Sequence, residues 1–346
     1  MNATIALFLA QDGVINGAIY ALLGVTLVLV FAVTRVIFVP QGEFVAWGAL
    51  TIAALEAGTV PGTAWLLAAL GLAAAGLEIA REHDTMTARR IGTMAIRDIA
   101  APLALLAAVV WLAPLKLGLL ANVVLTLAVL VPLGPLLYRI AFQPLADATV
   151  LVLFIASIGV HFALVGLGLV FFGAEGVRTT PFLDATLPVG PMRVKAQSLW
   201  VLAVAALVLA GLYCFFERTL TGKALRATAV NRLGARLVGI PVRSTGRTAF
   251  ALAAAIGALS GVLIGPLTTI YYDSGFLIGL KGFVAAIFGG LVSYPLTALA
   301  AVLVGLLESY SAFFASAFKE VIVFSLIIPV LLWRSFATVH DDEEDE

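Results

Sequence analysis

Among the ionisable residues inside long apolar stretches, three are the residues of this chain most able to do chemistry. Glu43 directly follows a Pro-Gln-Gly break, Glu308 lies in VGLLESYSAFF, and His161 lies in IASIGVHFALVGL. A charge inside hydrocarbon is costly unless it is paired or hydrated, so each position predicts either a transport pathway or a polar tie between helices. Glu43 could equally cap a helix start, and His161 could simply hydrogen-bond a neighbouring helix.

Three more polar residues, in the first two apolar stretches, complete the candidate set. The predicted pathway candidates are Asn16, Tyr20, Gln41, Glu43, His161 and Glu308. Motifs for other chemistry are missing from the sequence: TGKA at 221–224 lacks the upstream glycine of a phosphate-binding loop, because position 217 is Glu217. The single cysteine, Cys214, cannot form an intrachain disulfide or build a zinc site. We therefore predict no catalytic residue, no metal and no cofactor bound by this chain.

The composition indicates a membrane protein. The chain is 62% hydrophobic and 12% charged, with a mean hydropathy of +1.11, whereas soluble domains carry about a quarter charged residues. A span can satisfy its backbone in lipid only as a helix, so we predict an all-α polytopic integral membrane protein with about 8–11 transmembrane or re-entrant helices. The net charge is zero, which argues against a nucleic acid partner.

The apolar segments are separated by short polar interruptions. The predicted segments are 13–34, 36–56, 62–80, 99–113, 118–137, 150–172, 199–216, 248–272, 277–292, 296–317 and 320–333. The second is broken near residue 40 and predicts a discontinuous or re-entrant helix. The mixed charges of residues 81–98 predict a connector between two segments. We assign residues 1–338 to one transmembrane domain and residues 339–346 to a disordered acidic tail.

Residues 217–247 form the longest polar interruption of the chain and hold seven of its twenty Lys and Arg. The positive-inside rule places this block in the cytoplasm, which predicts an external N-terminus and a cytoplasmic C-terminus. Leucine or alanine recurs every fourth residue from 225 to 237, which predicts one amphipathic helix of roughly fifteen residues ending at Gly239. Such a helix either docks on a partner or lies at the membrane surface without one.

Four stretches resemble the membrane permeases of ABC importers for branched-chain amino acids, a family that includes urea and short-amide permeases. They are NGAIYALLGVTLVLVFAVTRVIF (16–38), QGEFVAWGAL (41–50), TGKALRATAVNRLGARLVGI (221–240), and GLKGFVAAIFGGLVSYP (279–295) with GLLES (305–309). The sequence departs from the family pattern in three places. Val39 to Gln41 stand where the family has Asn and His, residues 81–98 look like an insertion, and the acidic tail replaces a basic ending.

The resemblance implies an inner-membrane permease subunit that forms half of a translocation pathway. It also implies the partners: a second homologous permease subunit, two ABC ATPase subunits that carry ATP and Mg²⁺, a periplasmic binding protein and the lipid bilayer. Residues 225–240 would then couple to the ATPase. The coupling candidates are Leu225, Arg226, Ala229, Asn231, Arg232, Leu233, Arg236, Leu237 and Gly239.

Two other classes of function stay open at this point. A stand-alone secondary transporter would use the broken segment near Glu43, but it requires a coupling carboxylate and an inverted repeat, and we find no convincing repeat. An integral-membrane enzyme would require a nucleophile, base or metal cluster, and none stands out in the sequence.

Overall fold

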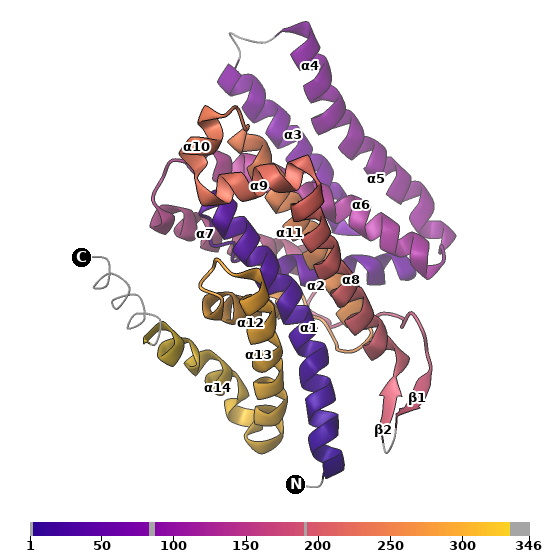
Figure 1. Ribbon diagram of the computed structural model, residues 1–346. Helices are drawn as coiled ribbons and strands as arrows, with labels where there is room; N and C mark the ends of the chain where they lie inside the picture. The colour runs from indigo at the N-terminus through magenta and orange to yellow at the C-terminus, as the bar shows by residue number, and fades with distance from the viewer. Residues whose placement is uncertain (1–2, 83–86, 190–191, 333–346) are drawn as a thin grey trace, which may run out of the picture.

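The computed structural model describes residues 3–82, 87–189 and 192–332, and these form a bundle of helices with one two-stranded hairpin (Figure 1). The α-helices in chain order are α1 (Ala3–Thr34), α2 (Gln41–Glu56), α3 (Gly62–Glu82), α4 (Ala88–Met94), α5 (Ala101–Leu112), α6 (Leu119–Leu137), α7 (Val150–Phe172), α8 (Ala196–Arg218), α9 (Leu220–Val230), α10 (Arg232–Leu237), α11 (Val242–Ile264), α12 (Ser274–Phe288), α13 (Tyr294–Phe314) and α14 (Lys319–Ser325). Strands β1 (Thr186–Val189) and β2 (Met192–Lys195) pair antiparallel, with Leu187 opposite Val194. The predicted all-α class is confirmed.

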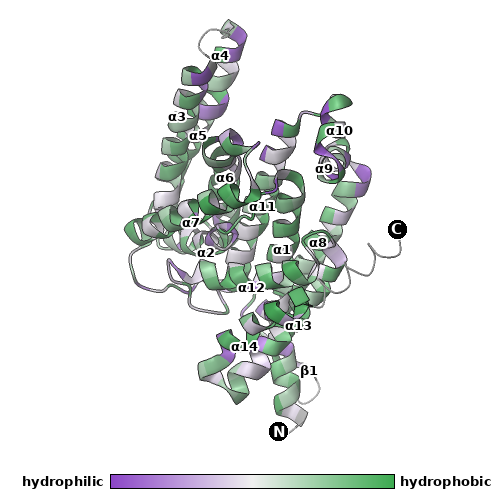
Figure 2. Ribbon diagram, turned by 90° about the vertical axis from the view of Figure 1, so that its left-hand side faces the viewer, coloured by the Kyte–Doolittle hydropathy of each residue, from purple (hydrophilic) through white to green (hydrophobic). Residues whose placement is uncertain are grey.

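Among the described residues, eight helices are long and apolar enough to cross a membrane. They are Thr4–Thr34, Gly62–Arg81, Ala88–Leu115, Leu119–Leu145, Val150–Phe172, Ala196–Arg218, Val242–Ile264 and Tyr294–Phe314. Hydrophobic residues dominate along these helices in Figure 2. Helix α12 has 15 residues, so it is about 22 Å long and shorter than the roughly 30 Å hydrocarbon layer. The acidic tail at 339–346 lies outside the described residues.

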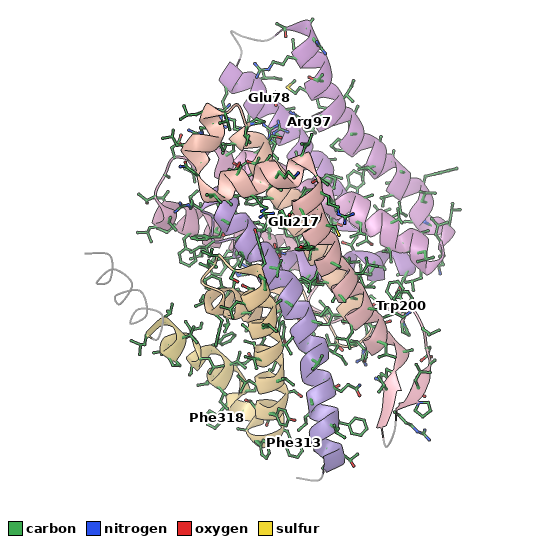
Figure 3. All side chains as sticks on the ribbon, in the orientation of Figure 1. Glu78, Arg97, Trp200, Glu217, Phe313 and Phe318 are labelled. Carbon is green, nitrogen blue, oxygen red and sulfur yellow. The ribbon has the colours of Figure 1, made fainter. Side chains whose placement is uncertain are left out.

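Helix α1 is the axis of the bundle. Its 32 residues make it about 48 Å long, and it packs along α13, α12 and α11. The two ends of the molecule differ in character: α9 and α10 lie at one end, and the N-terminal end of α1 lies at the other with the β-hairpin (Figure 1). Figure 3 places Glu78, Arg97 and Glu217 toward the α9–α10 end, and the exposed aromatic residues Phe313 and Phe318 at the opposite end.

The sequence predicted a connector at 81–98, and this prediction is wrong for the described part of it. Helix α4 continues through a π-helical turn at Ala95–Ala100 directly into α5. The two charged residues of this segment nearest to α5 are paired, which lets the helix continue into the bundle. Arg97 and Asp98 contact each other and two residues of other helices, so they enter the bundle without an unpaired charge. The polar interruption between the predicted segments 118–137 and 150–172 also begins with helical structure, a π-helical turn at Tyr138–Phe142 and a 3₁₀ turn at Gln143–Leu145.

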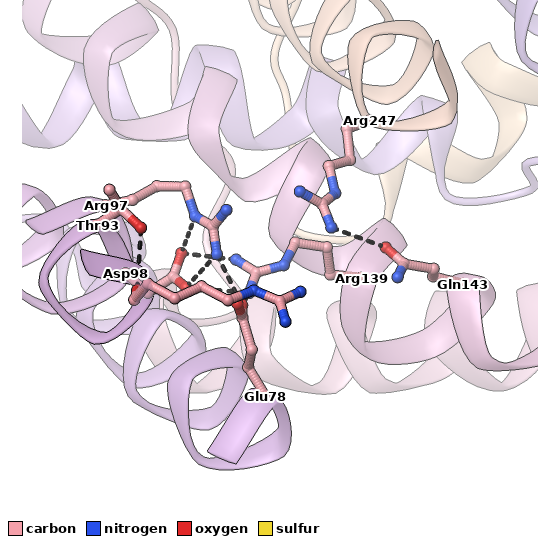
Figure 4. Close-up of polar contacts among 8 residues, drawn as sticks. Glu78, Thr93, Arg97, Asp98, Arg139, Gln143 and Arg247 are labelled. Atoms are coloured by element: carbon pink, nitrogen blue, oxygen red, sulfur yellow. Dashed lines mark hydrogen bonds and ion pairs between the residues drawn. The ribbon is translucent and has the colours of Figure 1, made fainter. Parts of the chain in front are cut away.

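Four residues from three parts of the chain form the ion network that holds α3, α5 and α6 together (Figure 4). Asp98 is 1% exposed and accepts hydrogen bonds from Arg97 at 2.7 and 2.8 Å and from Arg139 at 2.6 and 2.9 Å. Both arginines also reach Glu78 Oε2, at 2.8 and 2.6 Å. Two carboxylates and two guanidinium groups therefore satisfy one another at the α9–α10 end.

Helix α2 is the most buried helix of the core, and it begins at the break that the sequence predicted. The chain is irregular at residues 35–38, turns at residues 39–40, and then enters α2. The Val39 amide donates to Ser157 Oγ of α7 at 2.9 Å, which satisfies one backbone group of the break. At Gly42 the backbone of α12 crosses directly: a Cβ there would lie 1.9 Å from the Gly275 carbonyl oxygen. Only glycine permits this close approach.

We predict that Gly42→Ala destabilises the protein, because either α2 or α12 must move to admit the methyl group. Overpacking of this kind costs about 1–3 kcal/mol, which thermal unfolding of the purified protein would show as a lower Tm. The matched control is Gly166→Ala on α7, where an added Cβ meets nothing within 4 Å. Equal Tm values for the two variants would contradict the close crossing at Gly42.

We also predict that Asp98→Ala is strongly destabilising. Arg139 is 9% exposed and would keep Glu78 as its partner but lose both hydrogen bonds to Asp98, and breaking a buried pair in this way costs about 3–5 kcal/mol. Glu217→Ala is the control, because its pair with Arg226 is about half exposed and pairs of that kind contribute about 0–1 kcal/mol. If both variants unfold at the wild-type temperature, the ion network does not stabilise the fold.

Candidate functional site

The surface segment between α8 and α11 consists of two short helices joined at a sharp bend. Thr219 caps α9, since its hydroxyl accepts from the Gly222 amide at 2.9 Å. Asn231 is extended, with φ −150° and ψ 102°, and its side chain accepts from the Gly234 amide at 2.8 Å to start α10. Gly239 ends the segment with φ +85°, a conformation that favours glycine. The single helix predicted from the sequence is therefore wrong, because Asn231 caps a new helix instead of continuing the old one.

The bend separates the predicted apolar stripe into two halves that face different surroundings. Leu225 is fully buried and Ala229 is half-buried, whereas Leu233 is 68% exposed and Leu237 is 80% exposed. One straight helix would have kept all four on one face. The consequence is an exposed apolar surface at this end of the molecule, which we call the α9–α10 apolar surface. It consists of Leu220, Val230, Leu233, Leu237 and Val238.

The candidate arginines of this segment have partners within the chain. Arg226 pairs with Glu217 at the end of α8. Arg232 donates to the Ala146 carbonyl at 3.0 Å, and Arg236 lies 3.7 Å from the Asp147 carboxylate. Ala146 and Asp147 belong to the connection between α6 and α7. Arg232 and Arg236 therefore tie the segment to that connection, and Arg226 ties it to α8.

The Gln-Gly-Glu sequence at the start of α2 contacts three different helices. Gln41 Nε2 donates to the Ala253 carbonyl of α11 at 3.0 Å, and Gly42 meets α12. Glu43 points at α7, where its Oε1 lies 3.1 Å from His161 Nδ1. The angle of this contact is outside hydrogen-bond geometry, so neither carboxylate oxygen has a hydrogen-bond partner among the described residues. Glu43 therefore does not cap α2. The helix cap was one of the two roles that the sequence left open for Glu43, beside a position on the pathway.

An apolar cavity of about 240 Å³ lies beside His161. The ring of Phe276 in α12 packs on the imidazole, with 4.8 Å between the ring centroids. The cavity is lined by residues of α1, the break before α2, α7 and α12. These residues are Leu27, Ile37, Phe38, Val39, Phe154, Ile158, His161, Phe162, Phe276, Gly279, Leu280 and Phe283. A single polar side chain, His161, thus stands on an otherwise apolar wall.

Glu308 belongs to a second polar group, on the other side of α12. It accepts hydrogen bonds from the Tyr20 hydroxyl of α1 and from Lys281 Nζ of α12. Lys281 also donates to Glu320 Oε1 of α14 at 3.2 Å. Lys281 is 5% exposed, and it was not among the predicted pathway candidates. Lys281 lies inside the predicted apolar segment 277–292. The criterion that selected Glu43 and Glu308, an ionisable residue within an apolar segment, therefore applies to Lys281 as well.

This second group lines a polar cavity of about 730 Å³ at the N-terminal end of α1. Asn16, Tyr20 and Glu308 are brought together there, whereas Gln41, Glu43 and His161 lie on the other side of α12. The charged residues of the lining are Asp12, Arg193, Lys195, Lys281, Glu308, Lys319 and Glu320. The six predicted pathway candidates therefore form two groups, and α12 separates them.

An apolar bundle of spans with a buried charged cavity and a surface segment at its other end defines a multi-pass membrane permease. The chain belongs to the family described as the permease component of the branched-chain amino acid transport system, which it matches over residues 91–331. The matched range includes His161, the α9–α10 segment and Glu308. The break at the start of α2 lies before it.

Curated relatives include high-affinity branched-chain amino acid transport permeases. The chain is 30% identical to BraD of Pseudomonas aeruginosa over 203 residues, which is 57% of this chain and 66% of that protein. It is 28% identical to LivH of Escherichia coli over 203 residues, 56% of this chain and 65% of that protein. It is also 28% identical to the probable LivH of Methanocaldococcus jannaschii over 205 residues, 57% of this chain and 65% of that protein. The match thus covers just under two thirds of each relative.

We predict that the Glu43–His161 contact is energetically coupled. His161→Leu leaves the fully buried Glu43 carboxyl without its neighbouring polar group, and removal of one partner of a buried pair costs about 3–5 kcal/mol. The double variant Glu43→Leu with His161→Leu leaves no such group, so it should unfold at a higher temperature than His161→Leu alone. Phe162→Leu is the control, because that neighbouring side chain is 67% exposed.

A double-mutant cycle of Tm and unfolding free energy measures the coupling. If the two single changes simply add in the double variant, the contact at 3.1 Å carries no interaction energy.

Proposed function

We propose that this chain is the membrane-spanning permease subunit of an ATP-driven ABC importer. It would form half of the translocation pathway for branched-chain amino acids or a related small polar solute. Family membership and the names of the relatives support this assignment. The observation that carries it is the α9–α10 apolar surface, because large apolar residues exposed in a basic segment outside the spans favour a protein partner.

The proposed partner at this surface is an ABC ATPase. Leu233 and Leu237 point away from the bundle on α10, where they can enter a groove in the manner of a docking helix. The sequence contains no G-x-x-x-x-G-K-[ST] motif, so we assign ATP and Mg²⁺ to two separate ATPase subunits and no cofactor to this chain. A second homologous permease subunit and a periplasmic binding protein would complete the importer.

We further propose that the protein lies in the bacterial inner membrane with the α9–α10 end in the cytoplasm. Helices α9 and α10, which belong to the basic block at 217–247, lie toward that end in Figure 1, and Arg97 lies toward it in Figure 3, in agreement with the positive-inside rule. The N-terminus of α1 then faces the periplasm together with the polar cavity. The C-terminus is proposed to be cytoplasmic.

In this proposal, closure of the ATPase pair moves the α9–α10 segment as a unit. The segment is tied to the α6–α7 connection through Arg232 and Arg236, and it continues through Gly239 and Pro241 into α11. Movement of the segment would therefore displace α6, α7 and α11 together. The permease would act as a two-state element whose equilibrium is set by ligands bound to its partners.

The Glu43–His161 contact favours a second candidate function, a proton-coupled secondary transporter. A carboxyl and an imidazole 3.1 Å apart inside the bundle are groups that proton relays use in transporters. The two candidates differ in energy source. Uptake by an importer requires ATP, whereas uptake by a secondary transporter collapses when an ionophore dissipates the proton gradient.

The test is affinity purification of the tagged full-length chain from its own membrane in mild detergent, followed by mass spectrometry and uptake measurements. We expect a P-loop ATPase to co-purify and uptake in proteoliposomes to depend on enclosed ATP. Purification without an ATPase, combined with uptake that needs only a proton gradient, would overturn the importer proposal and favour the second candidate.

We predict that the double change Leu233→Asp and Leu237→Asp abolishes transport while the protein still inserts. Both side chains are exposed, so the fold tolerates the charge, but an apolar groove on the partner would not accept it. The readouts are the amount of ATPase that co-purifies and the uptake per amount of membrane-inserted protein. Leu187→Asp, in the β-hairpin at the opposite end, is the control and should leave both readouts unchanged.

Normal ATPase recovery with the double variant would show that these leucines are not the docking surface. If the double variant fails to insert, Gly239→Pro offers a second measurement. Proline cannot adopt the φ of +85° found there, so this change should alter the path from α10 to α11 without a new charge.

A further inference from the structure

One donor and two acceptors on the lining of the polar cavity beside α12 have no hydrogen-bond partner among the described residues. The Lys281 ammonium has three N–H groups, and two are directed at Glu308 Oε1 and Glu320 Oε1. Within the described part of the chain, no hydrogen-bond acceptor is recorded for the third N–H, and Nζ lies 5.8 Å from the centroid of the Tyr20 ring. The two buried acceptors without a partner among the described residues are Glu320 Oε2, which lies on the same carboxylate that Lys281 contacts, and Gln11 Oε1 of α1.

The charges around the cavity are nearly balanced. Four side chains are basic and three are acidic, which leaves one net positive charge on the lining. A cavity built for an anion or a cation would be dominated by the opposite sign. A balanced cavity with a free donor beside a free acceptor matches a ligand that carries both charges on neighbouring atoms.

We propose that this cavity is a binding site for the zwitterionic head of an α-amino acid, at the end of the pathway opposite α9 and α10. The substrate carboxylate binds Lys281, with Lys319 at the rim. The substrate ammonium binds Glu320 Oε2, and Glu308 stays with Tyr20. This inference rests on the proposed function, because it assigns to the amino acid substrate named there the first residues that it meets in the permease.

The position of Lys281 on the cavity wall allows it and its partners to contact a substrate as well as to hold helices together. Tyr20, Lys281 and Glu308 are each less than a tenth exposed, yet all three line a cavity of about 730 Å³, within the 300–1,000 Å³ range typical of small-molecule sites. The ion network of Asp98 borders a smaller cavity of about 240 Å³, but both oxygens of the Asp98 carboxylate already accept hydrogen bonds from arginines. The Lys281–Glu308 pair forms one wall of an open space.

The apolar part of the substrate has a complementary surface in the same cavity. Ile15, Leu267, Leu277 and Ile278 line it beside the charged group. An amino acid with an aliphatic side chain would therefore place its head on Lys281 and Glu320 and its side chain against α1 and α12. An uncharged amide or urea would leave the Lys281 ammonium and Glu320 Oε2 without ionic partners. The cavity therefore favours a zwitterion over an uncharged solute.

The experiment measures protection of a cysteine placed in the cavity. The reporter is the full-length chain with Cys214→Ser and Leu277→Cys, held in lipid nanodiscs and labelled with a hydrophilic maleimide. Leu277 lines the cavity and is 44% exposed. The probes are L-leucine, leucinol, 4-methylpentanoate and acetamide. Leucinol lacks the carboxylate, 4-methylpentanoate lacks the ammonium, and acetamide lacks both charges.

We expect L-leucine to slow labelling and the three analogues to leave it unchanged. At a leucine concentration about ten times the Kd, roughly a tenth of the sites stay free, so labelling slows by about tenfold. The control reporter is Leu187→Cys in the β-hairpin, which is also 44% exposed and outside the cavity. Equal protection by leucinol or acetamide, or no protection by leucine, would overturn the proposal.

Two variants test the residues. Lys281→Met should abolish protection, but it leaves Glu308 without its cation and can unfold the protein. The neutral double variant Lys281→Met with Glu308→Gln removes both charges and keeps a pair of similar shape, so it decides the question if the single variant fails to fold. Protection that survives in the double variant would show that the pair is structural. Lys116→Met, an exposed lysine outside the cavity, should keep full protection.

The result is separable from the test of the proposed function. Co-purification of an ATPase without leucine protection would remove the zwitterion site and leave the importer intact. Leucine protection without an ATPase would leave the binding site and remove the ATP-driven mechanism.

Discussion

The structure depends on how each charge that enters the apolar bundle is satisfied. An unpaired charge in hydrocarbon is too costly to keep, so each one must find a partner or water. The chain uses three arrangements. Both Asp98 carboxylate oxygens accept hydrogen bonds from arginines. Lys281 is paired and faces the larger, polar cavity. Among the described residues, Glu43 has no hydrogen-bond partner and lies 3.1 Å from His161 Nδ1. The degree of satisfaction separates a structural ion network from groups that a substrate or proton could reach.

The close crossing of α2 and α12 is the second constraint, because it fixes where the two cavities lie. Gly42 lets the α12 backbone approach α2 directly, so the short helix is held in the middle of the bundle. One face of α12 then presents Phe276 and Phe283 to the apolar cavity, and another presents Lys281 to the polar cavity. A full-length span would have packed against its neighbours along its whole length. A half-span leaves space at its end.

Hydropathy alone predicted most of the spans and the break before α2, because the cost of exposing backbone to lipid is local and can be read from a single segment. Three features were beyond that reasoning. The bend at Asn231 depends on a side-chain cap that competes with helix continuation. The helical course of residues 88–98 depends on Arg139, forty-one positions away from Asp98. The site around Glu308 depends on Tyr20, which is 288 positions distant. The sequence named Tyr20 and Glu308 as separate candidates and could not show that they touch.

The same contacts form a continuous physical connection from the α9–α10 segment to the cavities. Helix α10 leads through Gly239 into α11, and α11 accepts a hydrogen bond from Gln41 at 3.0 Å. The next residue, Gly42, touches α12, and the one after that, Glu43, touches His161. A displacement of α11 at Ala253 therefore acts on three consecutive residues that contact three different helices. Since there is no free space between Gly42 and Gly275, α12 must move with α2, and Lys281 must move with α12. The Gln-Gly-Glu sequence is thus where movement at the surface segment would be converted into a change of both cavities.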